Sequence, residues 1–255
     1  MASPTYQLRA LVLKRTKLGE TDVIVTLLSS DGSQVRAVAK GARKPSSSFS
    51  SRLEVYAVCD LLMSRGKSLD LVKEARLIES NDHLRSDFTG AATAAPLVEL
   101  IARASQEELK NPRLYSMSCA YLGMLETSAP GMQAQLCAAA LCKALAYLGF
   151  RPAFTQCAVC GSTNFVTGGG SSWAFSLSEG GVVCHDCARQ VESMRFPAAT
   201  LLFGRALTYS TFSEICELGE QRSATLSLFR LLQLWIRHHL GFDLRSVSFL
   251  LKEGW

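Results

Sequence analysis

The chain has 255 residues, 48% of them hydrophobic and 19% charged, which allows one or two folded domains and excludes a disordered chain. Its formal net charge of +5 lies in residues 1–80, which hold 13 Lys and Arg against 8 Asp and Glu, whereas the rest of the chain holds 14 of each. The uneven charge predicts a polyanionic partner for the N-terminal third.

The first 15 residues lack the long apolar stretch of a signal peptide. The most apolar long segment, residues 132–150, contains Lys143 and many alanines, which is typical of a buried helix and not of a membrane span. Five of the nine cysteines lack partner spacing, which indicates a reducing compartment; they are Cys59, Cys119, Cys137, Cys142 and Cys216. We therefore expect a cytoplasmic protein that does not bind membranes.

Residues 1–80 predict a domain of five short strands separated by turn signals, among them Asp31-Gly32. The expected strands are residues 6–16, 21–29, 34–40, 53–64 and 68–78. A closed barrel removes the exposed edges of such a set. An OB-type barrel fits best, and its usual ligands are single-stranded nucleic acids. An SH3-like barrel is the alternative.

Residues 32–53 carry five cations and no acidic residue. Arg36 and Lys40 have the same parity on the expected strand, so they would point to one face, and the following Gly-, Pro- and Ser-rich stretch predicts a loop. Such cations and hydroxyls suit a phosphate backbone, although a solvated surface loop is the alternative. The candidate DNA-binding residues of the barrel are Lys14, Arg15, Lys17, Arg36, Lys40, Arg43, Lys44 and Arg52.

From residue 81 the apolar spacing changes to a helical period, which predicts a helical domain over residues 81–255. Pro96 is expected to open one helix, and Asn111-Pro112 the next. Further helices are expected near residues 134–148, 197–209 and 222–240, the last closed by Gly241. The fold class is therefore α+β.

Two CxxC pairs, Cys157/Cys160 and Cys184/Cys187, are separated by 23 residues. Each pair can bring two thiolates to one metal ion, and together they predict a closed four-thiolate site for one structural Zn²⁺ in a module of about residues 154–190. Residues 164–167 and 173–178 would form its short ribbon, and Gly161 would adopt a positive φ. Redox-active dithiols are the alternative. Because such a site has no open position, we do not expect it to be catalytic.

The sequence contains no phosphate-loop, nucleophile-elbow or zinc-protease motif, so we do not expect an enzyme. Arg230 and Arg237 lie seven residues apart on one face of the last long helix, where they would be either solvated or a cationic rim for DNA or an acidic peptide. Arg103 and Lys143 on the earlier helices are the alternative cations for such a peptide.

Several segments resemble one family of proteins. They are GETDVIVTLL at residues 19–28, AVAKGAR at 37–43, LE at 53–54, DLL at 60–62, LGFRP at 148–152, CAVCG at 157–161 and LGFDLRS at 240–246. In this order they are similar to the RecO family of bacterial DNA-repair and recombination-mediator proteins. The resemblance implies an OB barrel, a helical bundle and a zinc module that occurs in part of the family.

The resemblance also implies a function. A member of this family would bind single- and double-stranded DNA, anneal complementary strands without nucleotide hydrolysis, and help to load the RecA recombinase at the nucleoid. Its implied partners are RecR and the acidic C-terminal tail of the single-stranded DNA-binding protein (SSB). The alternative is a zinc-containing regulatory or assembly factor whose barrel binds RNA or protein. Only the first should pair complementary strands coated with SSB.

Overall fold

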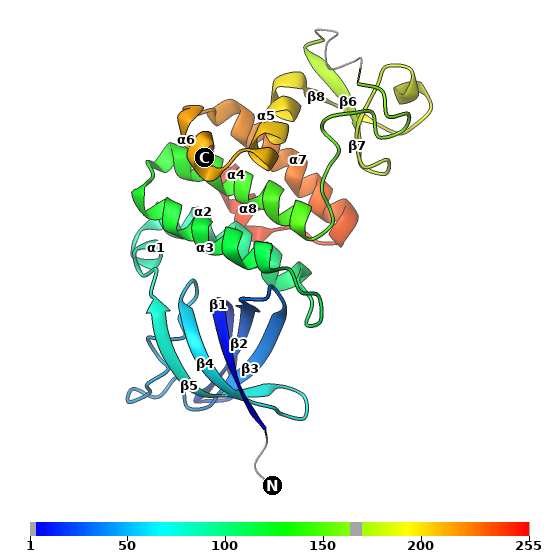
Figure 1. Ribbon diagram of the computed structural model, residues 1–255. Helices are drawn as coiled ribbons and strands as arrows, with labels where there is room; N and C mark the ends of the chain where they lie inside the picture. Colours follow the sequence, from blue (N-terminus) through cyan, green and yellow to red (C-terminus); the bar gives the residue numbers. More distant parts are fainter. Residues whose placement is uncertain (1–3, 164–169, 255) are drawn as a thin grey trace. The chain divides into compact units, whose positions relative to one another are not determined.

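A computed structural model describes residues 4–163 and 170–254 (Figure 1). The chain forms two compact units, Met1–Thr127 and Ser128–Trp255, which are described separately below. The boundary predicted after residue 80 falls where the fifth strand ends, and it remains a prediction about which parts fold alone. In the described part of the chain, every helix is too short or too polar to cross a bilayer.

The first unit contains a closed five-stranded barrel in the order β1-β2-β3-β5-β4, as the sequence predicts (Figure 1). Its strands are β1 (Thr5–Leu18), β2 (Asp22–Ser29), β3 (Gln34–Ala39), β4 (Val58–Ser64) and β5 (Asp70–Glu79). The pair β3–β5 is parallel, and the other pairs are antiparallel. The fourth strand begins at Val58 and not at residue 53, because residues 41–57 form a series of turns.

The long strand β1 pairs with two neighbouring strands, with β4 along its first part and with β2 along its second part. A β-bulge between Val12 and Lys14 shifts the register against β2. Side chains alternate between the two faces of a strand, so the extra residue reverses the alternation after it. Val12 pairs with Leu27 on the inner face, whereas Lys14 pairs with Thr26 on the outer face.

The barrel interior is filled by small and branched side chains. The turns between β3 and β4 close one end of it, because Ala42, Leu53 and Ala57 are buried there. Tyr6, Leu8, Val35 and Phe49 are partly buried against this core. The fully enclosed strand residues include Ala10, Val12, Val25, Leu27, Ala37, Ala39, Cys59 and Met63.

Three helices complete the first unit: α1 (His83–Ser86), α2 (Phe88–Ala104) and α3 (Pro112–Thr127). The expectation that Pro96 opens a helix is wrong, because Pro96 lies inside α2. The helix begins earlier, where the Asp87 carboxylate accepts a hydrogen bond from the Gly90 N–H at 2.7 Å and caps the first turn. Pro112 begins α3, as predicted.

The second unit is helical and carries the cysteine module. Its helices are α4 (Pro130–Tyr147), α5 (Ala198–Tyr209), α6 (Phe212–Glu217), α7 (Arg222–Leu240) and α8 (Arg245–Glu253). The bounds of α7 match the prediction, and Gly241 ends it with a φ of 76°. The helices α6 and α8 were not predicted from the sequence.

The cysteine module contains a small antiparallel sheet, β7-β6-β8, and a short 3-10 turn at Cys187–Arg189. Its strands are β6 (Ser172–Ser176), β7 (Gly181–Val183) and β8 (Met194–Pro197). The strand β6 confirms the predicted ribbon near residues 173–178, whereas the other predicted ribbon segment, residues 164–167, lies outside the described residues.

Candidate nucleic-acid interface and metal centre

The outer face of β1, β2 and β3 carries a row of polar side chains. Lys14, Thr26 and Arg36 lie directly opposite one another on the three adjacent strands, so their side chains share one face. Lys14 and Arg36 are exposed, and Thr26 lies between them. Lys40 has the same parity as Arg36 and is exposed just beyond the end of β3. We call Lys14, Arg36 and Lys40 the outer-face cations.

The loop after β3 is held against the turn between β1 and β2. The Asp22 carboxylate accepts hydrogen bonds from the Gly41 N–H at 2.7 Å and from the Thr21 hydroxyl at 3.0 Å. These bonds, the one from Gly41 above all, lower the pKa of Asp22. From the loop, the Arg43 guanidinium donates to the Gly19 and Glu20 carbonyls at 3.3 and 2.9 Å. These hydrogen bonds therefore join the turn at residues 19–22 to the segment at residues 39–43.

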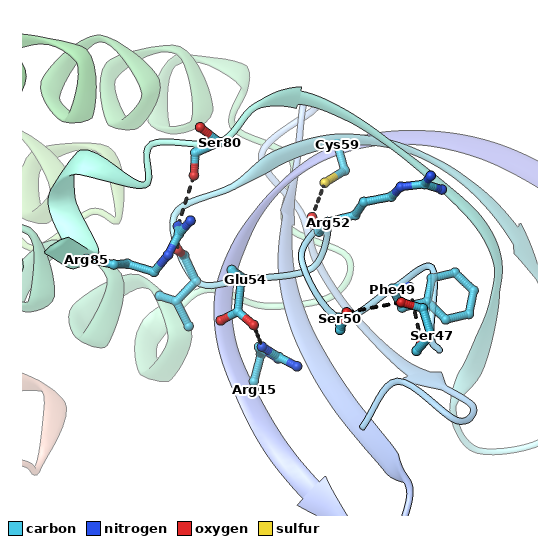
Figure 2. A network of polar contacts seen from close by, with 10 residues as sticks. Arg15, Ser47, Phe49, Ser50, Arg52, Glu54, Cys59, Ser80 and Arg85 are labelled. Carbon is cyan, nitrogen blue, oxygen red and sulfur yellow. Dashed lines mark hydrogen bonds and ion pairs between the residues drawn. The ribbon is translucent and has the colours of Figure 1, made fainter. Parts of the chain in front are cut away.

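Other predicted DNA-binding residues also make contacts inside the barrel unit (Figure 2). Arg15 is half-buried and forms an ion pair with Glu54, because its pairing with Val25 directs it to the inner face. Arg52 donates a hydrogen bond to the Ala75 carbonyl at 3.0 Å, and its own carbonyl accepts one from the Cys59 thiol at 2.8 Å.

Lys17 and Lys44 are exposed. The structure thus places Lys14, Lys17, Arg36, Lys40 and Lys44 at the surface, and it gives Arg15, Arg43 and Arg52 structural contacts in addition. Contact of these residues with DNA remains a prediction.

A second group of cations was missed by the sequence analysis. Arg9, Asp60 and Arg76 form a row across β1, β4 and β5, in which Asp60 receives hydrogen bonds from Arg9 at 2.7 and 3.0 Å and from Arg76 at 3.1 Å. These guanidiniums lower the pKa of Asp60, chiefly through the Arg9 hydrogen bonds. With Lys73 they line a groove of about 1110 Å³. Only strand register brings these residues together.

The four cysteines of the two CxxC pairs come together in the second unit, with all four sulfur atoms within 4.8 Å of one another. Cys160 Sγ lies 3.8 Å from Cys184 Sγ. The backbone N–H of Cys184 donates to Cys157 Sγ at 3.3 Å, and Gly161 has the expected positive φ, 73°. His185 is exposed and pairs with Asp186, so it stands apart from the sulfur cluster.

This cluster fits a tetrahedral metal ion. Four thiolates at about 2.3 Å from a central Zn²⁺ would lie about 3.8 Å apart, which matches the Cys160–Cys184 separation. Burial raises the pKa of Cys157, but backbone N–H groups outweigh it and lower the pKa to about 6. The side-chain hydrogen bond with Cys184 raises the pKa of Cys187 to about 12. A bound cation would favour ionisation of all four thiols.

The cations predicted to bind a partner peptide differ in their availability. The Lys143 ammonium is half-buried and donates to the Thr208 and Ser210 carbonyls at 3.2 and 2.5 Å, at the end of α5. Arg237 forms a two-point ion pair with Asp243, at 2.8 Å for both bonds. Arg103 lies 3.6 Å from Glu99 on α2, and Arg230 is exposed on α7. The peptide site remains a prediction.

Comparison with known proteins places nearly the whole chain in one family. Residues 1–81 match the family model "Recombination protein O N terminal", and residues 85–248 match "Recombination protein O C terminal". "DNA repair protein RecO" of Roseiflexus sp. is 31% identical over 254 residues, which cover 98% of this chain and 86% of the relative.

Two further relatives carry the same name. The protein of Desulfitobacterium hafniense is 34% identical over 188 residues, which cover 74% of this chain and 66% of the relative. The protein of Alkaliphilus metalliredigens is 29% identical over 230 residues, which cover 90% of this chain and 91% of the relative. The chain therefore belongs to the RecO family.

Proposed function

We propose that this protein is a DNA-binding recombination mediator in DNA repair. The observation that carries the proposal is the row of outer-face cations on the barrel, Lys14, Arg36 and Lys40, in a chain of the RecO family. The protein would bind single- and double-stranded DNA and anneal complementary strands in the bacterial cytoplasm, at the nucleoid. With RecR it would assist loading of RecA onto strands coated with SSB.

The proposed activity requires binding and no bond cleavage. Cations on the outer face would replace the counterions of the phosphate backbone, and the exposed loop hydroxyls of Ser46, Ser48 and Ser51 could donate to phosphate oxygens. Lowering the repulsion between two strands is sufficient to promote their pairing, so nucleotide hydrolysis is not needed. We accordingly propose that the protein is not an enzyme.

We also propose that Cys157, Cys160, Cys184 and Cys187 hold one structural Zn²⁺ per chain. The closeness of the four sulfur atoms supports this assignment. When bound, the ion would cross-link the two CxxC turns and would leave no position open for a substrate. Its role would be to stabilise the module.

For the acidic C-terminal tail of SSB, we propose the exposed face of α7 around Arg230. Arg230 is exposed, whereas Lys143 is occupied with the carbonyl groups at the end of α5. The Lys143→Glu substitution would bring a carboxylate to those carbonyl groups, so loss of binding in that variant would not locate the peptide. Arg230→Glu is the cleaner test, with Arg205→Glu on α5 as its control.

The proposed function is tested by strand annealing. Complementary single strands coated with SSB should pair faster in the presence of the protein, without ATP. The variant Lys14→Gln/Arg36→Gln/Lys40→Gln should lose most of this acceleration. An unchanged annealing rate in the presence of wild-type protein would contradict the proposal and would favour a regulatory factor that binds RNA or protein.

A further inference from the structure

One end of the barrel opens into a pocket of about 510 Å³ between the start of β1, the β2–β3 turn and the start of β5. It lies where β3 pairs with β5 only at Ala37 and Val38, so that residues 34–36 of β3 have no partner on β5. Tyr6, Leu8 and Val35 are partly buried at this opening, whereas polar and charged side chains line most of the pocket. A pocket of this size is in the range that accepts small ligands.

Within the pocket, one guanidinium lies over an aromatic ring. The Arg65 guanidinium lies over the Tyr6 ring, 4.4 Å from its centroid, and forms an ion pair with Asp70 at 3.3 Å. Asp70 also accepts a hydrogen bond from the Tyr6 hydroxyl at 2.5 Å and one from the Gly66 N–H at 3.0 Å. Asp70 therefore fixes both members of the stack.

The position of Arg65 is defined, yet the residue remains accessible. Its side chain is 66% exposed, whereas that of Asp70 is only 13% exposed. The part of the guanidinium that does not contact Tyr6 is therefore available to a ligand. A planar cation held in this way is a stacking platform, because an aromatic ring of any identity can lie on it.

The charges around the pocket are separated in a way that suits a nucleotide unit. Arg36, one of the outer-face cations, lines the pocket on the side of β3. Asp31 and Lys110 also line it, and they form an ion pair at 3.3 Å. Asp31 additionally accepts hydrogen bonds from the Ser33 hydroxyl and N–H, at 2.6 and 3.0 Å. Arg36 can therefore face a phosphate, while Asp31 and Asp70 hold the neighbouring pocket residues in place.

We propose that this pocket binds one unstacked base of single-stranded DNA, with the base on the exposed face of the Arg65 guanidinium and the adjacent phosphate near Arg36. The inference rests on the proposed DNA-binding function and adds to it a contact that requires an unpaired base. Phosphate contacts do not require an unpaired base. A base-stacking pocket at the end of the cationic row would favour single strands, and it would keep one base of a strand out of its stack before pairing.

The test uses the Arg65→Lys variant of the full-length protein. Lysine keeps the positive charge but lacks the planar group, so phosphate attraction is retained and stacking is lost. The control is Arg205→Lys, because Arg205 is exposed on α5 and lines no part of this pocket. Binding is measured by fluorescence anisotropy with three labelled ligands of equal length: oligo(dT), an abasic deoxyribose-phosphate oligomer, and a duplex.

We expect Arg65→Lys to weaken binding of oligo(dT) by about tenfold and to leave binding of the abasic oligomer and the duplex unchanged, since stacking of one base contributes of this order. Arg205→Lys should bind all three ligands like wild type. Equal weakening for oligo(dT) and the abasic oligomer, or no weakening for either, would overturn the pocket while the proposed function stands. Failure of the wild-type protein to bind any of the three would overturn the proposed function as well.

Discussion

The barrel and the four-cysteine module are both small β structures, but they are stabilised in different ways. The barrel encloses a continuous apolar core in which Val25, Leu27 and Met63 are fully buried. The corresponding cluster of the module consists of Cys157, Ala174 and Val183, two of which are small side chains. The module has strands of only 5, 3 and 4 residues.

The barrel and the module differ in where their stability comes from, and this difference decides which of them can carry charge on its surface. A closed barrel pairs its own strand edges and obtains its stability from the inside, so its outer face is free to carry cations for a ligand. The module has short strands and a small cluster around its cysteines, so we expect a metal ion to supply part of its stability. Phe175 on β6 also contacts Trp235 on α7, with ring centroids 5.6 Å apart, and this contact packs the module against the helix.

The largest effect is expected from breaking the metal centre. Cys160→Ser should remove the zinc and unfold the module, because metal binding contributes on the order of 10 kcal/mol to the folding of such small sites. Hydrogen exchange should show loss of protection in β6 and β7 while β2 and β4 keep theirs. Metal analysis of the wild-type protein should give about one zinc per chain.

The control for this variant is Cys216→Ser, since Cys216 lies in α6 and is not one of the four clustered cysteines. It should keep its zinc and its protection pattern. If Cys160→Ser retains protected amides in β6 and β7, or if the wild-type protein contains no zinc when prepared without chelators, the module is stabilised by packing and the contrast with the barrel fails.

A smaller effect is expected where the barrel packs closely against the loop before α3. Gly32 has a φ of +84°, and a Cβ atom there would lie 2.0 Å from the Asn111 carbonyl oxygen. Gly32→Ala should therefore lower the free energy of unfolding by about 3 kcal/mol, combining backbone strain with steric overlap.

Gly19→Ala is the matched control, because Gly19 also has a positive φ, +56°, but nothing within 4 Å of the added Cβ. Gly19→Ala should lower the free energy of unfolding by only about 1 kcal/mol, which is the strain of the backbone alone. Urea unfolding of both variants measures the difference. Equal losses would show that the contact between Gly32 and Asn111 does not constrain the barrel unit.

The smallest effect concerns pH. Partial burial raises the pKa of Asp31, but the hydrogen bonds from Ser33 outweigh it and lower the pKa to about 2. Since the folded pKa lies below the unfolded one, the stabilisation is present above about pH 4 and is lost as the pH falls toward about 2.

Asp31→Asn should therefore be less stable than wild type at pH 6, and the gap should narrow below pH 4. Thermal unfolding across this range measures it, with Glu20→Gln as an exposed control. A gap that stays constant down to pH 2 would mean that the ionised form of Asp31 is not the stabilising species.

Much of the fold could be predicted because its signals are local. Alternating apolar residues and turn signals located the five strands, and the stop at Gly241 located the end of α7. The start of α2 was predicted wrongly at Pro96, because proline is common at helix starts and the actual cap, Asp87, is not followed by a regular apolar period. The helices α6 and α8 were missed because they are short.

The candidate site was less predictable because it depends on register. The bulge after Val12 directs Lys14 outward and Arg15 inward, and sequence alternation alone cannot reveal an inserted residue. The row of Arg9, Asp60 and Arg76, and the stack of Arg65 on Tyr6, join residues from separate strands and turns. The four cysteines were predictable because the spacing within each pair is itself the signal.

The central claim is that the outer-face cations bind the phosphate backbone, and the salt dependence of DNA binding tests it most directly. Neutralising Lys14, Arg36 and Lys40 to Gln should reduce the slope of log K against log salt for oligo(dT) by about 2, since each phosphate contact on a single strand contributes about 0.7. The control neutralises Arg113, Arg205 and Lys252, which are exposed elsewhere, and it should leave the slope unchanged. An equal slope in the outer-face variant and the wild-type protein would contradict the claim.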